Sequence, residues 1–223
     1  PMVFTSFNFL IFFPAVVLLY YMIPVRFRWL LLLLASYFLY INIKPLYALL
    51  LAAVTVSTYI FTRLIDSTPD DRIKKRYMVI NIILVLLPLF FFKYFSAINS
   101  GLIGILEQAG VRWPLPEIKL LLPVGISFYT FVAIGYTIDV YNEEVKAEKH
   151  LGYTAVFISF FPLILSGPIE RARNLLPQIN SAKDASYSML TKGLKLMLWG
   201  YFMKLVVADR LGTYVDAIYN NLA

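Results

Sequence analysis

The residues best placed to do chemistry lie near the end of the apolar segment formed by residues 151–169. Prolines and a glycine interrupt this segment, and charged side chains follow at once: Pro162, Gly167, Pro168, Glu170, Arg171 and Arg173. A bilayer offers no partner to a backbone polar group, so a break at membrane depth is tolerated only inside protein or beside a water-filled cavity. The pattern predicts a re-entrant or broken helix whose charged end can bind an anionic group. A plain interfacial cluster of charges is the alternative.

No catalytic residue is predicted. His150, the only histidine, follows Lys149 in a charged loop, and nothing apolar surrounds it that would tune it as a general base. The acidic residues of this loop are expected to form a solvated face: Asp139, Glu143, Glu144 and Glu148. Asp139 is a partial exception, because it closes an apolar helix and could cap that helix or form a pair at the interface. With no cysteine and one histidine, neither a metal site nor a bound cofactor is expected.

Composition defines the class of protein. Of 223 residues, 60% are hydrophobic and only 15% are charged, whereas soluble domains carry about 25% charged residues. A soluble core of this size could not bury so many apolar side chains, so the chain is expected to be an integral membrane protein. The net charge of +7 comes from short Lys/Arg clusters between apolar segments. Such clusters indicate membrane topology and contact with anionic lipid, and they argue against a nucleic-acid partner.

The apolar segments predict an all-α, polytopic membrane protein, with residues 1–223 in a single membrane-embedded domain. About six segments are expected to be transmembrane or re-entrant helices: residues 4–25, 29–43, 45–62, 77–92, 120–138 and 151–169. Residues 63–76 are expected to form a polar loop, within which Ser67–Asp70 resembles a helix start.

Two further segments are expected at the membrane surface. Residues 99–119 mix glycine, proline and charges, which indicates an interfacial loop with a short amphipathic piece. Residues 187–207 contain three lysines among apolar residues, and a charge at the centre of a membrane helix costs about 2.5–3.5 kcal/mol. This segment is therefore expected to be an interfacial amphipathic helix, or one that faces a wet cavity, ending at Asp209 and Arg210.

The distribution of Lys and Arg predicts the orientation. Basic clusters at residues 26–28 and 63–76 are expected in the cytoplasm, which places the N-terminus outside and residues 139–150 inside. If residues 151–169 crossed fully, Arg171 and Arg173 would end outside. A re-entrant break returns them to the cytoplasmic side instead.

Four stretches resemble the membrane-bound O-acyltransferase (MBOAT) family: MVFTSFNFLIFF at 2–13, LPVGISFYTFVAIGYTIDVY at 122–141, SFFPLILSGPIERARNLLPQI at 159–179 and KLVVADRLGTYVDAIYNN at 204–221. The chain is similar to the bacterial branch that acts in alginate and peptidoglycan O-acetylation and teichoic acid D-alanylation. It departs from the pattern at Val132 and Leu163, where a glutamine is usual.

The resemblance implies a function for a larger protein. Members take an acyl group, here expected to be acetyl, from a cytoplasmic thioester donor, either acyl-CoA or an acyl carrier protein. They relay it through a funnel to an extracellular polysaccharide or a partner transferase at the bacterial cytoplasmic membrane. The proposed catalytic histidine of the family lies in a second half that has no match here. The chain is thus expected to be the N-terminal half of such an enzyme and inactive alone.

The same resemblance and the helix break together give a set of candidate donor-funnel residues: Ser127, Tyr129, Gly167, Pro168, Glu170, Arg171 and Arg173. Two other functions stay open. The broken segment could line the path of a transporter or channel subunit, or the chain could be a non-catalytic membrane assembly protein. The sequence leaves the acceptor open among alginate, peptidoglycan and teichoic acid.

Overall fold

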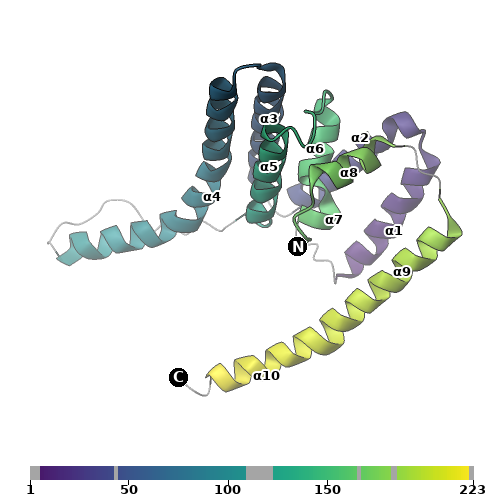
Figure 1. The fold of residues 1–223 in the computed structure, drawn as a ribbon. Helices are drawn as coiled ribbons and strands as arrows, with labels where there is room; N and C mark the ends of the chain where they lie inside the picture. The colour runs from purple at the N-terminus through teal and green to yellow at the C-terminus, as the bar shows by residue number, and fades with distance from the viewer. Residues whose placement is uncertain (1–5, 43–44, 109–122, 165–166, 182–184, 221–223) are drawn as a thin grey trace. The chain divides into compact units, whose positions relative to one another are not determined.

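The described part of the chain is helical throughout. The computed structural model describes residues 6–42, 45–108, 123–164, 167–181 and 185–220, and each regular element within them is a helix (Figure 1). The prediction of an all-α protein is confirmed for these residues. Among the helices of these residues, two are long and apolar enough to cross a membrane, judged by length and composition: α3 (Pro45–Ser67) and residues 71–95 of α4 (Asp71–Gln108). The number of crossings stays a prediction.

The chain separates into two compact units, one over residues 22–182 and one from residues 3–21 with 183–223. The first unit contains α3, α4 and a further set of helices: α2 (Val25–Ile41), α5 (Ile126–Tyr141), α6 (Leu151–Ser159), α7 (Phe161–Ile164) and α8 (Ala172–Asn180). In this unit α3, α4 and α5 pack against one another, and α2 packs on α3 and α6. The single domain predicted for the whole chain stays a prediction.

A buried polar chain joins the three packed helices α3, α4 and α5. The Ser57 hydroxyl donates to Oδ1 of Asn81 at 2.8 Å. The Nδ2 of Asn81 donates to the Thr137 hydroxyl at 2.8 Å, and that hydroxyl donates onward to the carbonyl of Ala133. Asn81 is fully buried, and every polar atom of its side chain has a partner. Such hydrogen bonds hold membrane helices together because they leave no polar group facing lipid.

The start of α4 is the one that the sequence predicts. The Oδ1 of Asp70 accepts a 2.7 Å hydrogen bond from the backbone N–H of Arg72, so Asp70 caps the first turn. The predicted polar loop 63–76 is wrong in extent, because α3 continues to Ser67 and α4 begins at Asp71. The polar residues on either side extend the two helices, since Lys and Arg are good helix formers.

The predicted loop over residues 99–119 is also partly wrong. Helix α4 continues through residue 108, and residues 109–119 lie outside the described residues. The two glycines at 101 and 104 cost only about 1 kcal/mol each in a helix. The leucine, isoleucine, glutamate and glutamine around them favour the helix.

The second unit contains α1 (Phe7–Met22) and three consecutive elements: α9 (Tyr187–Phe202), the π-helical turn η1 (Met203–Ala208) and α10 (Asp209–Asn220). The expected helix end at Asp209 and Arg210 is wrong, because α10 starts there. Asp209 forms an ion pair with Lys204 across the π turn, and an acid in the first turn of a helix is favourable. The predicted helix over residues 187–207 is confirmed, and its place at the membrane interface stays a prediction.

Candidate functional site at a helix break

Pro162 disfavours one continuous helix over residues 151–169, although Pro14 and Pro88 are accommodated inside α1 and α4. If α6 continued past Ser159, the ring of Pro162 would clash with the carbonyl of Ile158 one turn earlier. The chain instead leaves helical geometry at Phe160, where ψ is 107°. Pro162 then lies in the first turn of α7, a position that suits proline. The predicted break is confirmed, and it begins two residues before Pro162.

Helix α2 supplies a partner for the backbone at the break. In an unbroken helix, the N–H of Phe161 would bond the carbonyl of Phe157. Here it donates to the hydroxyl of Ser36 at 3.1 Å, and that hydroxyl donates in turn to the carbonyl of Leu32 at 2.8 Å. Ser36 and Phe161 are both buried. The break thus leaves this N–H satisfied without water, as membrane depth requires.

The turn before α5 lies directly against the end of α7. Gly125 has φ +79°, a left-handed conformation that favours glycine. A Cβ added there would collide with the carbonyl oxygen of Ile164. The hydroxyl of Tyr40 donates to the neighbouring carbonyl of Val124 at 2.6 Å. The backbone at Gly125 therefore fixes where the short helix α7 can lie.

The segment that follows α7 returns to the other end of α5. Nη1 of Arg171 donates to Oδ1 of Asp139 at 2.6 Å. The Asp139 side chain is 1% exposed and the Arg171 side chain is 55% exposed. Of the two roles open to Asp139 from the sequence, a cap or a pair at the interface, the structure shows the pair, and the solvated face expected for the loop acids does not include this residue. Oδ2 of Asp139 has no hydrogen-bond partner among the described residues, so Arg171 is the cation that compensates this buried carboxylate.

A second side-chain contact joins the segment after the break to the loop between α5 and α6. The side-chain amide of Asn180, at the end of α8, donates to Glu148 at 2.9 Å. Helix α8 therefore lies beside the loop that joins α5 to α6. With the Arg171–Asp139 pair, this contact brings residues 171–180 next to residues 139–148.

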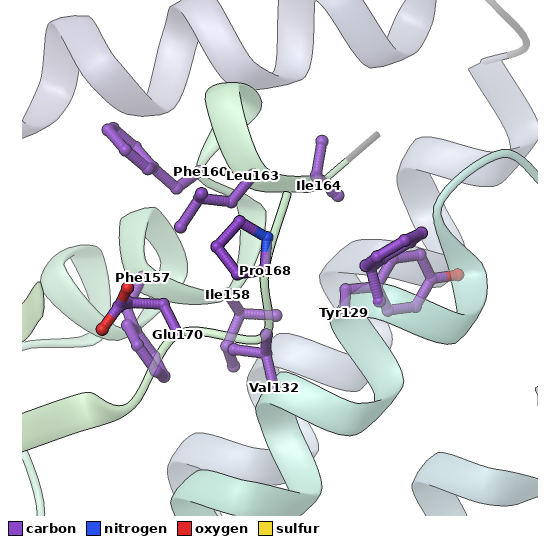
Figure 2. Close-up of a pocket in the computed structure, with 10 residues that line it drawn as sticks. Tyr129, Val132, Phe157, Ile158, Phe160, Leu163, Ile164, Pro168 and Glu170 are labelled. Atoms are coloured by element: carbon purple, nitrogen blue, oxygen red, sulfur yellow. The ribbon is translucent and has the colours of Figure 1, made fainter. Parts of the chain in front are cut away.

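A narrow crevice lies at the break, between α5, α6, α7 and the returning segment (Figure 2). Its volume is about 10 Å³, close to the least that one water molecule needs. Aromatic and aliphatic side chains form most of its wall, among them Phe157, Phe160 and Ile164. In Figure 2 the Tyr129 hydroxyl and the Glu170 carboxylate lie on opposite sides of Pro168. In this conformation the crevice has no room for an acyl group.

The structure brings part of the predicted site together. Tyr129, Pro168 and Glu170 line the crevice. The other candidates lie outside its lining: Ser127, Gly167, Arg171 and Arg173. Gly167 packs on Leu163, where a Cβ would meet the leucine backbone and side chain. The roles of all seven residues stay predictions.

Two positions singled out by the sequence reappear in the crevice wall. Val132 and Leu163, where a glutamine is usual in the family, both line it. The two residues come from different elements, Val132 from α5 and Leu163 from α7. Sequence reasoning missed five other residues of the wall, three of them aromatic: Phe128, Phe157, Ile158, Phe160 and Ile164. Helical spacing alone would mark them as ordinary packing residues.

His150 has a more defined role than a solvated loop residue. It is exposed, as expected, but its Nδ1 accepts a 3.1 Å hydrogen bond from the backbone N–H of Gly152 and caps α6. Its ring packs edge-on against Trp29 with centroids 4.9 Å apart. The ring lies among the residues of a separate groove and not in the crevice.

An ion pair ties the start of α4 to the loop after α5. Nζ of Lys74 lies 2.6 Å from Oε1 of Glu143. The hydrogen bond raises the pKa of Lys74 and lowers the pKa of Glu143. The Glu143 backbone has φ 60° at the turn out of α5, so the pair holds an uncommon backbone conformation beside the basic end of α4.

Several known proteins are similar in sequence to this chain. No family model matches the chain. The "Probable alginate O-acetylase AlgI" of Azotobacter vinelandii is 36% identical over 217 residues, which are 96% of this chain and 43% of that protein. The protein of the same name from Pseudomonas aeruginosa is 35% identical over 96% of this chain and 41% of its own length. A peptidoglycan O-acetyltransferase of Helicobacter pylori is 28% identical over 83% of this chain and 39% of its own length.

The described residues are helical throughout, and their two long apolar helices and the break between α6 and α7 indicate a helical membrane protein. The similarity extends over almost the whole chain and joins it to relatives named for acyl transfer to cell-envelope polymers. The chain belongs to the membrane-bound O-acyltransferase family, in the branch that contains these bacterial relatives. It spans less than half the length of the curated relatives that it matches, 39–43% for the three named.

Proposed function

We propose that the chain is part of a multi-pass O-acyltransferase of the bacterial cytoplasmic membrane. The complete protein would take an acyl group, acetyl in the simplest case, from a cytoplasmic thioester donor and relay it to an extracellular polysaccharide or a partner transferase. The names of the relatives support acyl transfer to the cell envelope. A charged carrier cannot cross lipid, so only the acyl group needs a path through the protein.

The observation that carries this proposal is the broken hairpin of α6, α7 and the returning segment. Arg171 pairs with Asp139 and Asn180 bonds Glu148, so both ends of the hairpin meet at one end of α5. In the proposed topology, about six segments are transmembrane or re-entrant, and this hairpin is the re-entrant one. Residues 170–183 then lie on the cytoplasmic side with residues 139–150, where a cytoplasmic donor arrives.

The donor would meet the charged end of the hairpin first. Glu170 borders the crevice, and the exposed side chains of Arg171 and Arg173 follow it. Arginine makes strong charge-assisted hydrogen bonds to phosphate, the group that both acyl-CoA and an acyl carrier protein carry. Because Arg171 also holds Asp139, the freer phosphate contact in this proposal is Arg173.

Acyl passage would require the crevice to widen. Tyr129, Val132 and Leu163 form its wall beside Pro168, so widening would require these side chains to move. No residue of this chain is proposed as the catalyst, since His150 caps α6 away from the crevice. In this proposal the base is supplied by the remainder of the protein, and residues 1–223 alone are inactive.

Donor kinetics of the complete enzyme test the proposal. Arg173→Ala should raise the apparent KM for the acyl donor more than it lowers kcat, because a remote phosphate contact contributes mainly uniform binding. Arg76→Ala is the matched control, since Arg76 is an exposed arginine on the proposed cytoplasmic end of α4. Equal donor kinetics for wild type and Arg173→Ala would overturn the donor contact. If the complete protein moved a solute across the membrane without transferring an acyl group, the role of a transporter subunit would be favoured instead.

A further inference from the structure

A second and larger groove lies between α2, α3 and α6, away from the crevice. Its volume is about 390 Å³, within the range of about 300–1,000 Å³ typical of ligand pockets. Aliphatic and aromatic side chains from all three helices form its wall, including Trp29, Leu33, Ala52, Val56 and Ala155. The groove is large enough for part of a hydrocarbon chain.

Aliphatic and aromatic carbon atoms form most of the groove wall. The hydroxyl of Thr55 in this wall donates to the carbonyl of Leu51 at 2.8 Å, so it needs no ligand as its partner. Burial of a polar group against an apolar wall without a hydrogen bond is costly, whereas a hydrocarbon has no such cost. The wall therefore favours an apolar occupant.

One end of the groove is aromatic and basic. The rings of Trp29 and His150 pack edge-on there, and a Cβ at Gly152 would collide with the Trp29 ring. Arg26 lies on α2 one helical turn before Trp29, and Lys149 directly precedes His150; both are exposed. Tryptophan favours the membrane–water interface, and lysine and arginine beside it attract anionic headgroups.

The neighbouring acid offsets only part of this positive charge, because Glu148 carries one charge against the two of Arg26 and Lys149. Glu148 accepts hydrogen bonds from the backbone N–H of His150 and from the amide of Asn180. The second of these bonds directs one carboxylate oxygen toward α8. The Tyr59 hydroxyl donates to the carbonyl of Lys149 at 2.8 Å, which fixes the backbone that carries the lysine.

We propose that this groove binds one acyl chain of an anionic phospholipid, with the headgroup against Arg26 and Lys149. The apolar wall between α2, α3 and α6 holds the chain. The basic end beside Trp29 and His150 selects the negative headgroup over a zwitterionic one. The site is separate from the crevice at the helix break and does not depend on the acyl-transfer proposal.

Trp29 provides a direct probe of the occupant. The chain has three tryptophans, so the variant Trp113→Phe with Trp199→Phe leaves Trp29 as the only one. This variant is reconstituted in vesicles whose phosphatidylglycerol or phosphatidylcholine carries brominated acyl chains at the same mole fraction. Brominated phosphatidylglycerol should quench Trp29 at least twofold more strongly than brominated phosphatidylcholine.

Two pairs of variants separate the groove from general lipid contact. Ala52→Phe fills the groove and should abolish the headgroup preference. Ala53→Phe adds the same ring at an exposed neighbouring position of α3 and should leave the preference intact. Lys149→Gln with Arg26→Gln should also abolish it, whereas the exposed Lys146→Gln should not. Circular dichroism confirms that each variant keeps its helix content.

Each other outcome overturns the proposal in a defined way. Equal quenching by both lipids would mean ordinary bilayer contact without headgroup selection. Weak quenching by both, unchanged by Ala52→Phe, would mean that a protein segment covers the groove. If weak quenching increased on dilution of the protein in lipid, a second copy of the chain would be the occupant.

Discussion

Arg171 and Asp139 form an ion pair in which one partner is buried and the other is half exposed. The Asp139 side chain is 1% exposed against 55% for Arg171, and their atoms lie 2.6 Å apart. The pair is therefore asymmetric. Loss of the arginine leaves a buried carboxylate without a cation, whereas loss of the aspartate leaves an arginine that water can solvate.

The two partners should respond differently to substitution. We expect Arg171→Ala to lower the free energy of unfolding by roughly 1–3 kcal/mol, because it leaves a buried polar group unpaired. Asp139→Asn should cost less, since exposure of Arg171 weakens the pair. The double variant should be more stable than Arg171→Ala alone. Thermal unfolding in detergent measures all three, and equal losses for both single variants would contradict a buried Asp139.

Gly125 should tolerate no side chain. Gly125→Ala meets both a left-handed backbone conformation, which costs an L-residue about 1–2 kcal/mol, and a collision with the carbonyl of Ile164. We expect a loss of about 2 kcal/mol or more in unfolding free energy. Gly135→Ala, inside the α5 helix that Gly125 precedes, is the control, because a Cβ there meets nothing within 4 Å. It should be neutral or stabilising by up to about 1 kcal/mol, and a similar loss at both positions would refute the close approach of α7.

The Lys74–Glu143 pair should make stability depend on pH at both extremes. The pKa of Glu143 is lowered from 4.5, so its contribution is present above that value and is lost as pH falls through the lowered pKa. The pKa of Lys74 is raised from 10.5, so its contribution is present below that value and is lost as pH rises through the raised pKa. The pair is thus complete between about pH 4.5 and 10.5.

Glu143→Gln should reduce the loss of stability at acidic pH. We expect a smaller fall in Tm between pH 5 and pH 3 than in wild type, and a difference that shrinks at high salt because exposed pairs are screened. Glu144→Gln replaces the exposed neighbouring acid and should show the same fall in Tm at acidic pH as wild type. If Glu143→Gln also showed the wild-type fall in Tm, the pair would not form in solution.

The re-entrant topology predicts one-sided labelling. The chain has no cysteine, so single cysteines at positions 146 and 173 can be tested in intact cells with a membrane-impermeant maleimide. Both should be protected until the membrane is opened, because Arg171 holds its segment beside Asp139 on the proposed cytoplasmic side. Labelling of one position and protection of the other would mean that residues 151–169 cross the bilayer.

Local chemistry made the break predictable. Pro162 disfavours a continuous helix, and the sequence alone locates the interruption to within two residues. Proline is not sufficient for a break, however, because Pro14, Pro88 and Pro177 lie inside continuous helices. The cap at Asp70 was also predictable from local chemistry, because the capping side chain lies within three residues of the N–H it binds. The lengths of α3 and α4 were not, since polar residues at their ends fit a helix as well as a loop.

The assembly of the site was beyond local reasoning. Tyr129, Pro168 and Glu170 were predicted because they lie beside the break or on the preceding helix, but the aromatic wall depends on how α5 and α6 pack. Asp139 and Arg171 are 32 residues apart, and nothing in the spacing identifies which acid of residues 139–150 meets which arginine. That choice is made by burial, since Asp139 faces the packed helices while Glu143 and Glu144 are exposed.

The hydrogen bond from Phe161 to Ser36 has a consequence for synthesis of the protein. The two residues are 125 positions apart, and chains are made and assembled from the N-terminus. The acceptor is therefore made and inserted well before the ribosome reaches the broken segment. The N–H of Phe161 therefore finds the Ser36 hydroxyl already in place when the broken segment is made. If the broken segment came first in the chain, this N–H would enter lipid without a hydrogen-bond partner.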